Sequence, residues 1–146
     1  MTSLDKYIST LNFEEGIRIA KEMEPRELHK AILNFAFESN YSIVWYPFLL
    51  EMIKREETPE LHYIAFEILS EPLCHLEGAL EASLYHARKA IELSNSNNAD
   101  YLSCLITLNY IPETIVSDKE AKEVALKILE LDPNHQFAKE SLERLK

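Results

Sequence analysis

Histidine and cysteine are the residue types in this chain best suited to metal binding or nucleophilic chemistry. They occur at seven positions: His29, His62, His75, His86, His135, Cys74 and Cys104. No histidine belongs to an H-E-x-x-H or Glu-x-x-His pattern, and the cysteines form no C-x-x-C pair. His75 and His86 are predicted to share a helix face, but 11 residues of helix span about 16 Å, too far for one ion. The sequence therefore predicts no metal site and no cofactor, with both cysteines reduced and packed as small apolar residues.

Other catalytic patterns are equally hard to find. The chain has two glycines, Gly16 and Gly78, which is too few for a loop that cradles phosphate. No G-x-S-x-G motif is present. Glutamates are so numerous that a pair suited to acid–base catalysis cannot be told from ordinary solvated helix faces. We therefore identify no catalytic residue and expect a protein that is not an enzyme.

The most apolar segment, residues 41–53, offers candidate binding residues. Its rings Trp45, Tyr46 and Phe48 are crowded together and point to different sides of any helix. Pro47 predicts that the helix begins near it or bends there, and we expect a helix over 42–56 with an irregular first part. Two interpretations remain open: these rings form core on both faces of a central helix, or one of them lines a binding groove.

Acidic residues gather just after this segment, and Glu56, Glu57 and Glu60 complete the candidate partner-binding set with Trp45 and Tyr46. The net charge is −10, from 15 basic and 25 acidic residues. Acid is in excess in both halves of the chain, so no basic face is available for a nucleic-acid backbone. Such an acidic surface favours a basic partner or serves solubility alone, and the sequence leaves both open.

The segment 76–93 determines the fold class. Its apolar and small residues recur with the period of an amphipathic helix, and four of the eight are small: Ala79, Ser83, Ala87 and Ala90. A second copy of this pattern follows at 118–131, with KAIEL at 89–93 matched by KILEL 38 positions later. The same offset pairs Tyr63 with Tyr101. Internal repeats in this range of lengths indicate stacked helix pairs.

The runs 90–93 and 128–134, AIEL and ILELDPN, carry a family resemblance. Together with Gly78 before the first run, they resemble the second helix and exit turn of a tetratricopeptide repeat. The resemblance covers roughly residues 59–146. It implies a right-handed stack of antiparallel helix pairs, an α-solenoid, with a groove that binds protein.

Capping signals divide the chain into about nine helices within one domain, residues 1–146. Asn12, Thr58 and Ser117 are predicted N-caps, and Pro25 and Pro59 fit the first position of a helix. The expected helices span roughly 3–11, 14–23, 25–38, 42–56, 59–70, 76–93, 99–110, 118–131 and 136–145. The sequence therefore predicts an all-α fold.

The function expected from these features is a protein–protein interaction module for a protein or peptide partner. A small, acidic, single-domain chain suits an immunity or antitoxin-type inhibitor of a basic toxin, and equally an adaptor or chaperone. The alternative is an enzyme or small-ligand carrier with an aromatic pocket near Trp45. The N-terminus lacks the pattern of a signal peptide and no apolar run approaches about 18 residues, so a cytoplasmic protein without membrane contact is expected. The oligomeric state stays open.

Overall fold

The computed structural model describes residues 3–39 and 42–146, and every regular element within these ranges is an α-helix. The nine helices are α1 Ser3–Ser9, α2 Phe13–Glu22, α3 Pro25–Glu38, α4 Trp45–Arg55, α5 Pro59–Ser70, α6 Ala79–Leu93, α7 Ala99–Tyr110, α8 Asp118–Leu131 and α9 Gln136–Arg144. This confirms the predicted all-α fold.

Four helices begin where their capping residues and prolines predict. The side chains of Asn12, Thr58 and Ser117 each accept a hydrogen bond from the backbone N–H three residues later, at 3.5, 3.2 and 3.2 Å. Pro25 and Pro59 occupy the first turn of α3 and α5, where a missing N–H leaves no hydrogen bond unmade. These local signals fix the starts of four helices.

One predicted helix start is wrong, and the structure locates a second within its expected irregular part. Helix α6 begins at Ala79 rather than near residue 76, because Gly78 has a φ of 81° and residues 71–78 form turns. His75 therefore lies in this connection and shares no helix with His86. Helix α4 begins at Trp45, which places Pro47 in the first turn, where it needs no intrahelical partner. Residue 41, the first of the apolar segment, lies outside the described residues.

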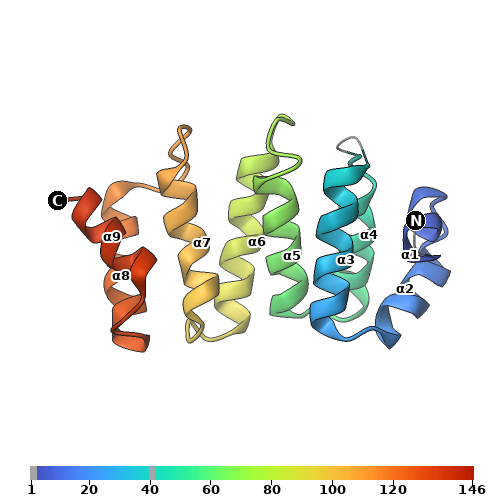
Figure 1. Ribbon diagram of the computed structural model, residues 1–146, viewed down its shortest axis with the longest axis horizontal. Helices are drawn as coiled ribbons and strands as arrows, with labels where there is room; N and C mark the ends of the chain where they lie inside the picture. Colours follow the sequence, from blue (N-terminus) through green and yellow to red (C-terminus); the bar gives the residue numbers. More distant parts are fainter. Residues whose placement is uncertain (1–2, 40–41) are drawn as a thin grey trace.

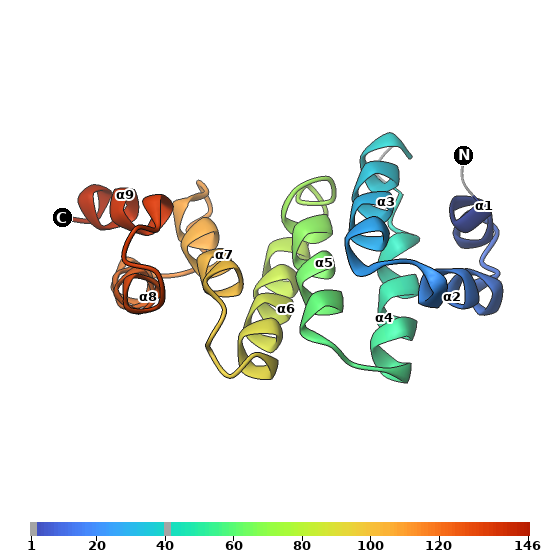
Figure 2. The ribbon, with the colours of Figure 1, turned by 60° about the horizontal axis from the view of Figure 1, so that its bottom comes forward.

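The helices lie side by side in a row that runs from α1 at one end of the molecule to α9 at the other (Figures 1 and 2). Helix α5 contacts α3, α4 and α6, and α7 contacts α6, α8 and α9. One apolar cluster joins helices α1 to α5 and a second joins α5 to α9. Helix α5 thus contributes to both clusters and links the two halves of the row.

The small residues of α6 lie in its interior contacts, as the sequence predicts. Ala79, Ser83, Ala87 and Ala90 are all buried. Helix α6 packs between α5 and α7, so both neighbours approach its backbone closely.

Replacing Ala87 with phenylalanine is expected to lower the free energy of unfolding by about 1–3 kcal/mol, because no space exists for a ring at this buried site. Urea denaturation measures the change. The matched control is Lys122→Ala on the exposed face of α8, expected to change stability by less than about 0.5 kcal/mol. Equal urea denaturation midpoints for the two variants would show that Ala87 does not lie on the buried face of α6.

The helix bounds correct the register of the internal repeat. Helices α5 and α7 have 12 residues each and start 40 positions apart, at Pro59 and Ala99. Their buried positions also coincide at that spacing, so Tyr101 corresponds to Leu61 and not to Tyr63. The buried positions of α6 and α8 coincide at 38. The spacing from α7 to α8 is therefore two residues shorter than the spacing from α5 to α6. One offset applied to the whole repeat cannot show this difference.

Candidate functional site

An open hollow lies between α2, α3, α4 and α5, with a volume of about 270 Å³. Its walls are largely apolar, and the apolar lining includes Ile17, Met23, Leu28, Met52, Leu61 and Ile64. Glu56 and Glu60, two of the residues singled out from the sequence, also line it, and both are exposed. The hollow therefore combines an apolar floor with carboxylates at its margin.

A second hollow of about 290 Å³ crosses α3, α5 and α7. Its aromatic lining comes from Tyr63 and Tyr101, whose ring centroids are 5.3 Å apart, and from His29, 5.6 Å from the Tyr63 ring. Glu60 and Asp100 add carboxylates. Because Pro25, Glu60 and Ile64 line both hollows, the two adjoin. We call the combined surface the Glu60 groove.

Charged residues of both signs line the Glu60 groove: Glu56, Glu60 and Asp100 are acidic, and Lys21, Arg26 and Arg55 are basic. Arg55 lines the first hollow, but its guanidinium bonds Glu14 and also Glu51, at 3.1 Å. In the second hollow, His29 pairs with Glu67 from α5. Burial, and secondarily the Glu67 carboxylate, raise the pKa of the Tyr63 phenol, which therefore stays neutral. Two basic groups of the wall, Arg55 and His29, are thus matched by carboxylates of the same chain, and Lys21 and Arg26 are further basic residues of the lining.

The five sequence-predicted site residues fall into three places. Glu56 and Glu60 line the groove, whereas Tyr46 and Glu57 lie at a buried histidine pair described below. Trp45 is 0% exposed and packs in the core against Phe35 and Phe48. The interpretation of Trp45 as a surface contact is therefore wrong, because no partner reaches its ring.

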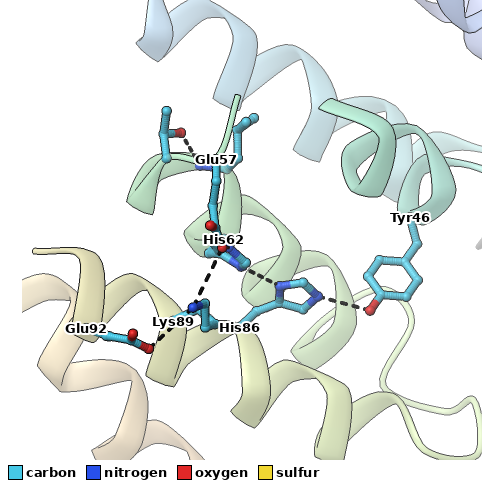
Figure 3. Close-up of polar contacts among 8 residues, drawn as sticks. Tyr46, Glu57, His62, His86, Lys89 and Glu92 are labelled. Atoms are coloured by element: carbon cyan, nitrogen blue, oxygen red, sulfur yellow. Dashed lines mark hydrogen bonds and ion pairs between the residues drawn. The ribbon is translucent and has the colours of Figure 1, made fainter. Parts of the chain in front are cut away.

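The histidine pair joins three helices through a continuous series of polar contacts (Figure 3). His62 of α5 and His86 of α6 face each other, with their Nδ1 atoms 2.8 Å apart. His86 Nε2 lies 3.0 Å from the Tyr46 hydroxyl, and His62 Nε2 lies 2.9 Å from Glu57 Oε1. Both imidazoles are buried. We call these four side chains the histidine chain.

The partners of the histidine chain fix its proton positions when both rings are neutral. A carboxylate accepts hydrogen bonds only, so His62 Nε2 carries a proton and donates to Glu57. His62 Nδ1 is then an acceptor, which requires a proton on His86 Nδ1. His86 Nε2 in turn accepts from the Tyr46 O–H. All three hydrogen bonds thus run in one direction, from Tyr46 to Glu57.

The electrostatics agree with a neutral His86 ring and an ionised Glu57 carboxylate. Burial, with a smaller contribution from the neighbouring His62, lowers the pKa of His86 to about 4. The hydrogen bond from His62 lowers the pKa of Glu57. Burial raises the pKa of the Tyr46 phenol, which keeps its proton available for donation.

Sequence reasoning missed the histidine chain because its members are far apart and match no motif. The corrected register supplies a signal. His62 corresponds to Leu102 at the 40-residue spacing, and His86 corresponds to Val124 at the 38-residue spacing. All four positions are buried. Two polar rings therefore stand where the next helix pair has two aliphatic side chains.

Within residues 3–39 and 42–146, no group of three or more His, Cys, Asp or Glu side chains is placed to hold a metal ion. No helix in that part of the chain is both long enough and apolar enough to cross a bilayer. Cys74 and Cys104 are free thiols, and burial raises the pKa of Cys104.

Comparisons of the chain with protein-family models, curated proteins and solved structures found no match.

Proposed function

We propose that this chain is a non-enzymatic, tetratricopeptide-like binding module that holds a segment of a partner protein in the Glu60 groove. The observation that carries the proposal is the meeting of two open hollows at one exposed carboxylate, Glu60. An apolar hollow beside an aromatic and acidic one suits an extended peptide better than a compact metabolite. Such grooves obtain affinity from buried apolar anchors and specificity from the charges around them.

The chemistry of the groove defines the occupant. The first hollow accepts an apolar side chain between Ile17, Met52 and Leu61. Glu60 and Asp100 then favour Lys or Arg at the neighbouring peptide positions. The rings of the second hollow add faces on which a cation can rest. The proposed occupant is therefore a peptide segment with an apolar residue flanked by basic ones.

A net charge of −10 extends the same preference to a whole partner. A basic toxin held by an immunity or antitoxin-type inhibitor satisfies it, as does a basic client of an adaptor or chaperone. We propose such a role for a cytoplasmic protein. The core position of Trp45 argues against the alternative, an enzyme or ligand carrier built on an aromatic pocket at that residue.

Selection of peptides from a random display library should enrich sequences with Lys or Arg beside an apolar residue. Glu60→Lys should weaken binding of an enriched peptide at least about tenfold, which corresponds to about 1.4 kcal/mol. The matched control is Glu130→Lys, an equally large charge change at an exposed position of α8, remote from the groove. Isothermal titration calorimetry measures both. Equal losses of peptide affinity in the two variants would indicate attraction by the overall negative charge alone. That result would contradict binding in the Glu60 groove.

Association of a basic peptide with the protein should slow as salt increases, because screening shortens the range of the acidic field. Stopped-flow measurements between roughly 50 and 500 mM salt test this expectation. Reversing both Glu56 and Glu60 should slow association and flatten its salt dependence without unfolding the protein. An association rate that is independent of salt would remove electrostatics from the explanation.

A further inference from the structure

The two buried histidines are not required by the packing of the helix pair. Leu102 and Val124 occupy the corresponding positions of α7 and α8, and apolar side chains fill that site. Burying polar rings is costly unless every donor and acceptor is matched, and here each match comes from another helix or connection. The histidine chain therefore adds a property that an aliphatic pair lacks.

The histidine chain holds α4 near both of its ends. Tyr46 is the second residue of α4 and bonds His86 of α6. Glu57 follows the C-terminal end of α4 and bonds His62 of α5. Helix α4 supplies one wall of the Glu60 groove through Met52 and Arg55, and α5 supplies the facing wall. Contacts of the two histidines thus position a wall of the proposed binding site.

The histidine chain can bind one additional proton without losing its contacts, but it cannot bind two. A first proton can bind His86 Nε2 if the Tyr46 hydroxyl turns to become an acceptor. A second proton must bind His62 Nδ1, which already faces the N–H of His86 Nδ1 at 2.8 Å. Two N–H groups and two positive charges cannot remain at that distance in a buried site. The second proton therefore separates the rings.

The charged and titratable neighbours modulate this response. Tyr85 of α6 is 56% exposed and its ring contacts both histidines, at 6.2 and 5.1 Å between centroids. Lys89 Nζ lies 3.8 Å from Glu57 Oε1 and 3.4 Å from Glu92 Oε2, as Figure 3 shows. Charges of both signs, the Lys89 cation and the Glu57 carboxylate, therefore lie beside the histidine chain. Tyr85 and Glu57 are the solvent-exposed neighbours of the pair.

We propose that His62 and His86 form a pH-sensitive clasp that holds α4 in place at neutral pH and frees it when both rings become charged. Freeing α4 changes the width of the Glu60 groove, so the clasp makes partner binding depend on pH. This last step rests on the proposed function, whereas opening of the clasp is a property of the chain alone.

Long-range ¹H–¹⁵N spectra of the imidazoles test the resting state, with assignments from the single variants His62→Leu and His86→Val. At pH 7.5, a proton on His86 Nδ1 and on His62 Nε2 is expected. The opposite tautomers in the wild-type protein would overturn the clasp. This measurement needs no ligand.

Hydrogen exchange of the α4 amides, measured by mass spectrometry at pH 7.5 and 4.5, tests the opening. After correction for intrinsic exchange rates, α4 protection in the wild type should fall at least about tenfold more than α8 protection. The double variant His62→Leu/His86→Val, which copies the residues of the next pair, should lose this difference. Equal pH responses of α4 in the wild type and the double variant would overturn the proposal.

The affinity of a peptide selected on the groove separates the two proposals. If the clasp regulates binding, affinity changes between pH 7.5 and 4.5 in the wild type and stays constant in the double variant. Peptide binding with the same pH dependence in both proteins refutes regulation while preserving the groove. A protein that binds no peptide, yet shows selective α4 opening, refutes the groove while preserving the clasp.

Discussion

Replacing Trp45 with alanine should lower the free energy of unfolding by about 3–5 kcal/mol. The indole is wholly buried, contacts the rings of Phe35 and Phe48, and belongs to the apolar cluster of the first five helices. Its removal leaves a large cavity that the surrounding helices cannot fill. Thermal and urea denaturation should both show the loss.

Two further variants determine what the loss means. Leu126→Ala, at a site 56% exposed on α8, should change stability by less than about 0.5 kcal/mol. Trp45→Phe should cost less than Trp45→Ala, because it keeps a ring and removes an indole N–H that has no acceptor among the described residues. A Trp45→Ala protein with unchanged stability would instead place this ring at the surface and revive it as a binding residue.

Acidification should destabilise the protein through His86 by about 3 kcal/mol between pH 7.5 and 4. The pKa of His86 is about 4 in the folded protein, below its ordinary value of 6.5, so the unfolded chain binds this proton first. The stability that neutral His86 contributes is fully present above about pH 6.5 and is lost as pH falls towards about 4. Urea denaturation across this pH range measures the loss.

The double variant His62→Leu/His86→Val isolates this effect from carboxylate titration elsewhere. Between pH 7.5 and 4, the free energy of unfolding should fall in both proteins. The fall should be about 3 kcal/mol smaller in the double variant than in the wild type. Tyr46→Phe removes the donor to His86 Nε2 and should destabilise the neutral-pH protein, leaving a buried acceptor unmatched. Parallel stability curves for the wild type and the double variant would contradict the assigned protonation.

Local chemistry made the helices predictable. Thr58 with Pro59 and Ser117 with the acidic turn that follows it give unambiguous starts, and the structure has these helices at Pro59 and Asp118. The start of α6 was misjudged because the apolar period continues through Leu76, while the backbone conformation of Gly78 interrupts the helix. Periodicity reports which residues are buried, and it does not report where hydrogen bonding begins.

The candidate site was less predictable because it depends on contacts between distant residues. Glu56 and Glu57 are adjacent in the sequence, yet one lines the groove and the other bonds His62. The pairing of His62 with His86 spans 24 positions and required the packing of α5 against α6. No local pattern distinguishes such histidines from exposed ones, whereas the correspondence with Leu102 and Val124 does so once the register is known.

The Glu60 groove can be tested most directly by mapping where a selected basic peptide binds. Titration of the ¹⁵N-labelled protein with this peptide should shift the amide resonances of Met52, Glu60, Ile64 and Tyr101, which surround the two hollows. The same titration of the Glu60→Lys variant should give much smaller shifts at equal peptide concentration. Shifts confined to α8 and α9 in the wild type would place the binding surface elsewhere and contradict the account.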